Sequence, residues 1–154
     1  MKTFPNSSGG AINKDRLSLV EAGGARILIA DDDSWTSESV SSLNDHYRIV
    51  VVRDGREAYR LLKTDADFAV AVLSLNLPCL RGVDIINYMK TERRLMRIPV
   101  VIISGEMGID TISSSFSAGA MAFIPKPFTT DQLEHILRLT LNSKQSRPQL
   151  HRAA

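Results

Sequence analysis

Five short apolar runs, each followed by a segment with a helical pattern, constrain the fold of this chain more than any other feature. The runs cover residues 26–30, 48–52, 69–75, 98–104 and 121–125. The helical segments cover residues 34–47, 54–64, 82–96, 109–119 and 129–142. Strands that are almost entirely apolar are typical of a parallel sheet covered by helices on both faces. The sequence therefore predicts an α/β fold, a doubly wound five-stranded parallel sheet.

Local signals indicate where several of these helices begin. Ser34 is a candidate N-cap for the first helix, because its hydroxyl can accept a hydrogen bond from a backbone N–H of the first turn. Asp54 precedes Glu57 by three residues, and Thr129 precedes Gln132 by three residues. Both pairs have the spacing of a capping box, which supports helices that start beside residues 54 and 129.

The two ends of the chain differ in composition from its middle. Residues 1–25 are rich in Ser, Gly and Asn and predict a flexible leader, with a short helical turn near residues 15–22. Residues 143–154 contain three basic residues and no acid, and they predict a flexible basic tail. The remaining segment, 26–142, carries 13 basic and 15 acidic residues and is predicted to be one domain.

Composition and hydropathy exclude several classes of protein. Cys79 is the only cysteine, so the chain cannot form an internal disulfide. No run approaches the roughly 18 apolar residues of a membrane span, and the first residues lack the apolar core of a signal peptide. We therefore expect a cytoplasmic protein without a membrane partner.

Polar residues gather where the predicted strands end. In a doubly wound sheet, the functional crevice lies at the carboxyl ends of the strands. Adjacent carboxylates repel each other and require a counter-charge, either Mg²⁺ or a lysine, and this combination also suits a phosphoryl oxygen. The residues at these strand ends are Asp31, Asp32, Asp33, Ser74, Asn76, Ser104, Glu106 and Lys126.

Four motifs, ILIADDD, LNLPCLRG, VVIISGE and FIPKPF, occur in this order along residues 26–142. In order and spacing they closely resemble the receiver domain of two-component response regulators, the CheY-like fold. The resemblance implies a flavodoxin-like (βα)5 sandwich with strand order 2-1-3-4-5. It also implies a function in phosphorelay signal transduction.

The resemblance further implies roles for single residues. Asp31 and Asp32 match the acidic pair, and Asp32 with the backbone carbonyl of Asn76 would be ligands of Mg²⁺. Ser104 and Lys126 match the residues that contact the phosphoryl group. Each of these roles belongs to a pocket that binds a phosphoryl group and a divalent cation.

Two further residues and one surface also match the family. Phe123 occupies the position of the switch aromatic, and Gly82 matches the glycine that opens the helix after the third strand. The partners implied are a histidine kinase, an output protein or a second copy of the chain. We expect them on the face made by the helix at 109–119, the strand at 121–125 and the helix at 129–142.

Ser74 departs from the family pattern. The phosphoacceptor aspartate of the family lies four residues before the loop proline, here Pro78, and no acid occurs between Phe68 and Arg81. The motif places no activating base beside a serine at this position, and a serine would form an inert phosphoester. We therefore expect an atypical receiver that is not an enzyme and acts through protein–protein interaction. Mg²⁺ binding should be weak or absent, and Lys126 should pair with Asp31 or Asp32.

Two alternatives remain at this point. The chain could be a phosphate-regulated receiver that uses Ser74 or another acceptor. It could also be an unrelated small α/β hydrolase or nucleotide-binding domain. The second alternative is disfavoured because no glycine-rich phosphate loop follows the first strand and no histidine lies near the strand ends. The residues after 142 are too few for a helix-turn-helix unit, so direct nucleic-acid binding is not expected.

Overall fold

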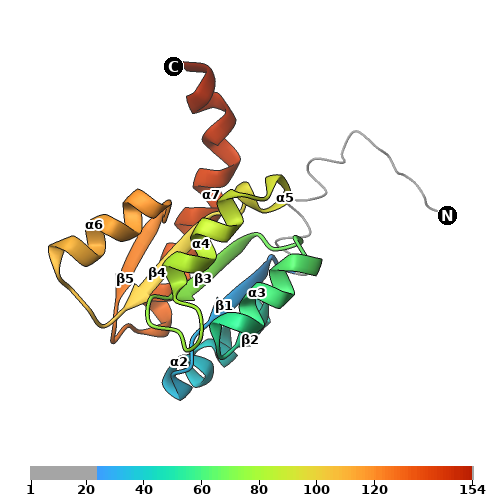
Figure 1. Ribbon diagram of the computed structural model, residues 1–154. Helices are drawn as coiled ribbons and strands as arrows, with labels where there is room; N and C mark the ends of the chain where they lie inside the picture. Colours follow the sequence, from blue (N-terminus) through green and yellow to red (C-terminus); the bar gives the residue numbers. More distant parts are fainter. Residues whose placement is uncertain (1–23, 154) are drawn as a thin grey trace.

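A five-stranded parallel sheet forms the centre of the protein in the computed structural model, which describes residues 24–153 (Figure 1). The strand order is β2-β1-β3-β4-β5, and every neighbouring pair is parallel. The strands are β1 (Arg26–Ala30), β2 (Arg48–Val52), β3 (Val70–Ser74), β4 (Val100–Ser104) and β5 (Ala122–Pro125). The predicted fold class and strand order are confirmed.

Helices cover both faces of this sheet. They are α2 (Ser34–Ser39), the 3-10 helix η2 (Val40–Asp45), α3 (Gly55–Thr64), α4 (Gly82–Lys90), α5 (Arg93–Met96), α6 (Ile109–Ala118) and α7 (Thr130–Ala153). The core cluster on one face contains residues of α3, α4 and α5, and the cluster on the other contains residues of η2 and α7. The sheet is therefore doubly wound, as expected.

The central strands show why this arrangement is stable. All five residues of β3 and of β4 are buried. In β1, Leu28 and Ala30 belong to one core cluster, whereas Ile27 and Ile29 belong to the other. Successive residues of a strand point to opposite faces, so an apolar run without alternation places apolar groups in both clusters at once.

Two predicted helices are each divided in two. The segment predicted at 34–47 forms α2 and then η2, and the segment predicted at 82–96 forms α4 and α5. The second division has a local cause, because the Thr91 hydroxyl donates to the Tyr88 carbonyl at 2.7 Å and Thr91 is the C-cap of α4. A side chain that binds a carbonyl of the last turn competes with the next backbone hydrogen bond of the helix.

The predicted N-cap of the first helix is wrong by one residue. Asp33, and not Ser34, has extended backbone angles and caps α2, because its Oδ1 accepts a hydrogen bond from the Trp35 backbone N–H at 2.9 Å. A carboxylate also interacts favourably with the positive end of a helix dipole, which a serine hydroxyl does not. The predicted cap of α3 at Asp54 is confirmed.

The C-terminal segment also differs from its prediction. We expected a flexible tail at 143–154, but α7 continues as a helix to Ala153. The predicted leader at 1–25 and its helical turn lie almost entirely outside the described residues. Within residues 24–153, no helix is both long and apolar enough to cross a membrane.

Candidate functional site

The predicted site residues lie at one edge of the sheet, where its parallel strands end. The main chain fixes this edge, because the Asp31 N–H donates to the Val52 carbonyl and the Lys126 N–H donates to the Ser104 carbonyl, at 3.0 and 2.8 Å. We call this edge the rim, and it consists of Asp31, Asp32, Ser74, Asn76, Ser104 and Lys126. These residues end or follow four strands, β1, β3, β4 and β5, that are neighbours in the sheet.

Asp31 is the buried charge at the centre of the rim. Its side chain is fully buried, and its carboxylate is paired with the Lys126 ammonium, with Nζ 2.9 Å from Oδ2 and 3.0 Å from Oδ1. The Thr36 hydroxyl donates to Oδ2 at 2.7 Å, and the Asp33 backbone N–H donates to Oδ1 at 3.3 Å. Burying a carboxylate is costly unless it is paired and hydrogen-bonded in this way.

Two aromatic residues close to the rim along the chain, Trp35 and Phe128, contact each other. Lys126 precedes Pro127 through a cis peptide bond, and the next residue, Phe128, is buried. The Phe128 ring meets the Trp35 ring edge to face, with centroids 5.1 Å apart. Trp35 is 40% exposed, so its indole lies at the boundary between this contact and solvent.

Asp32 lies in a different environment from Asp31. It is exposed, and its backbone carbonyl accepts a hydrogen bond from Arg53 Nη2 at 2.8 Å. Its carboxylate has no hydrogen bond or ion pair with any residue that the structure describes. The two members of the acidic pair are therefore distinct, because one is neutralised by a lysine and the other faces solvent.

Ser74 is the last residue of β3, beside this acidic pair. It is only 3% exposed and pairs with Ile103 of β4. Across the described part of the chain, its hydroxyl has no hydrogen-bond partner. Its carbonyl lies against Gly82, where a built Cβ would be 2.6 Å away. The main chain thus fixes the position of Ser74, and its side chain contributes no hydrogen bond to the fold.

Ser104 and Asn76 are linked through Glu106. The Glu106 backbone N–H donates to Ser104 Oγ at 2.9 Å, and Asn76 Nδ2 donates to Glu106 Oε2 at 3.2 Å. The loops after β3 and β4 are therefore joined by polar contacts. The Ser104 hydroxyl still has a proton to donate to a ligand.

The donor set of the rim is poor for a magnesium ion. Mg²⁺ prefers near-octahedral oxygen coordination with carboxylates among its ligands. Asp31 is engaged by Lys126, which leaves the Asp32 carboxylate, the Asn76 carbonyl and a neutral hydroxyl at Ser74. Within residues 24–153, no group of three metal-ligating side chains comes together. These residues do not fit a tightly held divalent cation.

Phe123 lies in the last strand and Gly82 at the start of the helix after β3, the positions predicted for them. Phe123 pairs with Ile102 in the sheet and is partly buried against the core cluster beneath α3 and α4. Gly82 begins α4 directly behind β3, so close to the Ser74 carbonyl that a side chain would overlap it. Gly82 is therefore required by a close backbone approach.

Two residues of the site were missed in the sequence. Thr36 follows Asp31 by five residues, and the first turn of α2 brings its hydroxyl back to the carboxylate. Arg53 directly follows β2, whose carboxyl end lies at the same edge of the sheet as that of β1. Its position directly after a predicted strand could therefore have identified Arg53 as a residue of the site.

Comparison with known proteins agrees with this geometry. Residues 27–138 match the model of the response regulator receiver domain family. The chain is 29% identical over 110 residues to the cell cycle transcriptional regulator CtrA of Caulobacter vibrioides. That alignment covers 70% of this chain and 46% of CtrA, so the chain spans less than half of that relative.

Two solved structures share the fold. A CheY-like receiver domain protein of Methanospirillum hungatei JF-1 matches with a TM-score of 0.72 at 22% identity, over 80% of this chain and 98% of that one. The receiver domain of the sensor histidine kinase PA1611 of Pseudomonas aeruginosa PAO1, with a magnesium ion coordinated in its active site cleft, matches with a TM-score of 0.68 at 22% identity, over 77% and 98%. The family match shows that the chain belongs to the response regulator receiver domain family, and the strand order and the rim agree with it.

Proposed function

We propose that this receiver domain signals by binding a protein partner and carries no aspartyl phosphate. The observation that carries the proposal is the serine at the end of β3, Ser74. In the family reaction a carboxylate attacks a phosphorylated histidine or a small phosphodonor and forms a labile acyl phosphate. The Ser74 hydroxyl has no hydrogen-bond partner among the described residues, and therefore no base that could activate it.

The ion pair at the rim supports the proposal that the pocket keeps one conformation without a bound phosphoryl group. Lys126 already neutralises Asp31, and Thr36 occupies a second position on the same carboxylate. No phosphoryl group is needed to balance the charge of this buried pair. We therefore propose that the domain presents one binding surface constitutively, and that it is not an enzyme.

We propose that Mg²⁺ binds weakly. The magnesium ion in the PA1611 receiver shows that a protein of this fold can coordinate the metal in its active site cleft. Here a serine hydroxyl replaces an anionic ligand, and a magnesium ion with fewer charged ligands retains its water shell more readily. Asp32 and the Asn76 carbonyl would be the protein ligands of any bound ion.

The face formed by α6, β5 and α7 is the surface we propose for the protein partner. Its helix α6 is low in charge, and Phe116 on α6 and Leu139 on α7 are 46% and 49% exposed. Beside Leu139, a groove of about 180 Å³ runs between β5 and α7 and is lined by Met121, Ala122, Ile136, Leu139, Thr140 and Ser143. Exposed apolar groups next to a groove are typical of protein interaction sites. A histidine kinase, an output protein or a second copy could occupy this face.

Intact mass tests the proposal directly. Wild type, Ser74→Asp and Ser74→Ala are incubated with Mg²⁺ and acetyl phosphate, which would transfer its phosphoryl group to a carboxylate and release acetate. Only Ser74→Asp should gain the mass of one phosphoryl group, because the rest of the pocket is in place. Ser74→Ala controls for phosphorylation elsewhere. A gain in the wild type would contradict the proposal, and the exposed Asp32 carboxylate would be the first acceptor to map.

A further inference from the structure

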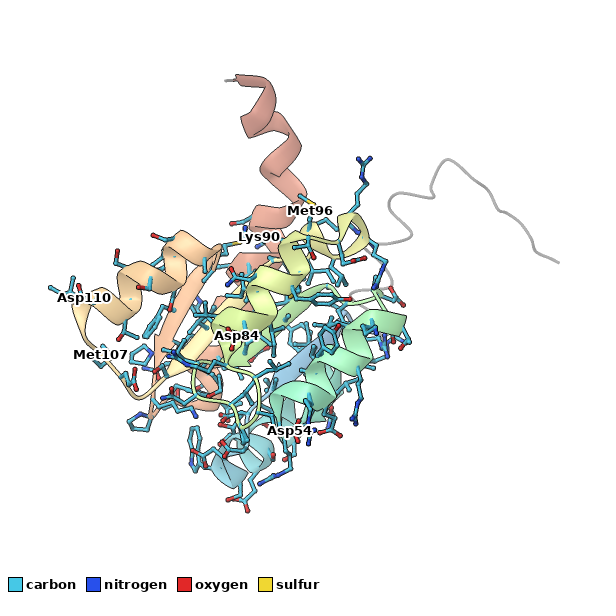
Figure 2. The ribbon with its side chains drawn as sticks, in the orientation of Figure 1. Asp54, Asp84, Lys90, Met96, Met107 and Asp110 are labelled. Atoms are coloured by element: carbon cyan, nitrogen blue, oxygen red, sulfur yellow. The ribbon has the colours of Figure 1, made fainter. Side chains whose placement is uncertain are left out.

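We propose that a second face of the domain binds an acidic helical segment of a partner protein. This face is distinct from the α6–β5–α7 face. It consists of exposed basic residues on α3, on α5 and at the C-cap of α5, and we call it the α3–α5 basic face; its members are Arg56, Arg60, Lys63, Arg93 and Arg97. Figure 2 labels two residues that flank it, Asp54 before the start of α3 and Met96 on α5.

Helical spacing places three of these bases in one row. Arg56, Arg60 and Lys63 are four and three residues apart, so their side chains share one face of α3. The opposite face of the helix is buried through Ala58 and Leu62. The row of positive charge therefore points away from the core.

The acids of this region are already engaged by local contacts. Asp54 Oδ1 accepts the Glu57 backbone N–H at 2.8 Å, and Glu57 Oε1 accepts the Arg53 backbone N–H at 3.0 Å. Asp84 accepts the Arg81 backbone N–H at 3.1 Å. These carboxylates fix helix ends, and none of them forms an ion pair with the basic face within the described chain.

The bases, in contrast, are largely without partners. Within residues 24–153, the guanidinium groups of Arg56, Arg60 and Arg93 have no hydrogen bond and no ion pair. Arg97 only donates to the Arg94 carbonyl at 3.4 Å. An unpaired guanidinium presents its fork of donors to solvent, in the geometry that suits a carboxylate.

Arg94 fixes α5 to the end of α3, which makes the face continuous. Its Nη1 donates to the Leu62 carbonyl at 2.7 Å and its Nη2 to the Lys63 carbonyl at 2.9 Å. These are carbonyls of the last turn of α3, which lack partners within the helix. The bases of the two helices are thus presented together on a rigid support.

Aromatic and apolar groups lie beside the bases. Tyr59 on α3 and Tyr88 on α4 meet edge to face with centroids 4.6 Å apart, and both are partly exposed. The Lys63 ammonium lies 5.4 Å from the centre of the Tyr59 ring. Met96 on α5 is 60% exposed. Tyrosine, methionine and arginine are the residue types enriched in protein interfaces.

Charge favours a short acidic protein segment over nucleic acid as the occupant. The segment 26–142 holds 13 basic and 15 acidic residues, so its overall field does not attract a polyanion. A local row of guanidiniums can still pair with carboxylates on one helix. Glutamates four residues apart on a partner helix would match the spacing of Arg56 and Arg60.

Fluorescence anisotropy with defined probes tests this face on the full chain. One probe is an alanine-based helical peptide with glutamates along one face, and the other is its isomer with the same glutamates spread round the helix. The proteins are wild type, Arg60→Glu and Arg48→Glu. Arg48 is exposed at the start of β2, outside the basic face, so its reversal changes the net charge equally and is the matched control.

The wild type should bind the one-face peptide more tightly than the isomer. Arg60→Glu should weaken this binding by about tenfold or more, and Arg48→Glu should leave it nearly unchanged. Equal affinity for both peptides, or an equal loss in both variants, would overturn the proposal. Tighter binding of a DNA duplex or of anionic vesicles through Arg60 would replace it with a different ligand, and self-association lost in Arg60→Glu would identify a second copy instead.

Discussion

Lys126 Nζ lies within hydrogen-bonding distance of both carboxylate oxygens of Asp31, at 3.0 Å from Oδ1 and 2.9 Å from Oδ2. The two residues are 95 positions apart in the chain, and they join the ends of β1 and β5 across the rim. Because Asp31 is fully buried, this contact neutralises a charge that solvent cannot reach. Its removal should therefore affect folding as well as the site.

Replacing Lys126 with methionine should destabilise the fold. Breaking a buried ion pair leaves an uncompensated charge, and we expect a loss of about 3 kcal/mol in the free energy of unfolding, because Thr36 and the Asp33 amide still bind Asp31. Urea denaturation measures the loss. The double variant Lys126→Met with Asp31→Asn should recover a large part of it. A single variant as stable as wild type would contradict this view of the pair.

The matched control for that variant is Arg138→Met. Arg138 pairs with Glu134 one turn earlier on α7 at 3.0 Å, but its side chain is 61% exposed. A solvent-exposed pair contributes little to stability. Its loss should shift the urea midpoint far less than the loss of Lys126.

Magnesium should leave the fluorescence of Trp35 unchanged at sub-millimolar concentration. Trp35 is the only tryptophan of the chain, and its backbone N–H binds Asp33 beside the acidic pair. Weak binding follows from the neutral hydroxyl at Ser74, so Ser74→Asp should restore a saturable response to Mg²⁺. A saturating change in the wild type at sub-millimolar Mg²⁺ would refute weak binding.

Alanine at Gly82 should destabilise the domain. A Cβ there would lie 2.6 Å from the Ser74 carbonyl oxygen, and the backbone of β3 cannot yield without disturbing the sheet. We expect a loss of about 1–3 kcal/mol, measured by chemical denaturation. Gly105→Ala is the control, because a Cβ at Gly105 meets no atom within 4 Å. Equal losses in the two variants would show that the contact at Gly82 is not the cause.

Asp65 should contribute a small, pH-dependent stability. The Asp67 backbone N–H, which donates to Asp65 at 2.9 Å, lowers the pKa of this carboxyl below its usual 3.8, and the Arg26 guanidinium at 2.7 Å lowers it further. The contribution is therefore present above the pKa of the unfolded chain and is lost as the pH falls through the folded value.

Asp65→Asn checks this sign. Because the pair is partly exposed to solvent, which screens it, we expect the variant to lose only about 0.5 kcal/mol at neutral pH, and the difference from wild type should vanish towards strongly acidic pH. Asp67→Asn is the control, since the Asp67 side chain forms no hydrogen bond or ion pair within the described residues and its backbone N–H, which binds Asp65, is kept. A difference that stays constant from neutral to acidic pH would contradict the assignment.

The sequence could predict the sheet because its strands are encoded locally. Runs such as residues 100–103 are buried on both faces, which favours apolar residues at every position. The division of the helix predicted at 82–96 was harder to predict, because it depends on one hydroxyl of Thr91 bonding to a carbonyl of the preceding turn. Apolar residues resume at Leu95 and Met96, six and seven positions after Met89, a spacing that one continuous helix would also allow.

The site was predictable as a set of strand ends but not as a set of contacts. Lys126 could be expected to pair with either Asp31 or Asp32, since both follow β1. Only the fold decides that Asp31 points inward to the lysine while Asp32 faces solvent. The hydrogen bond from Thr36 likewise depends on where α2 begins.

The contact between Gly82 and the Ser74 carbonyl distinguishes the main chain at residue 74, which the fold holds, from its side chain. The main chain at residue 74 is held by pairing with β4 and by the glycine behind it, whereas the Ser74 hydroxyl binds nothing among the described residues. A change at Gly82 is therefore expected to act on folding, whereas a change of the side chain at 74 is expected to act on the site alone. Under the proposal made above, one substitution at residue 74 would change the mode of control while the domain keeps its fold.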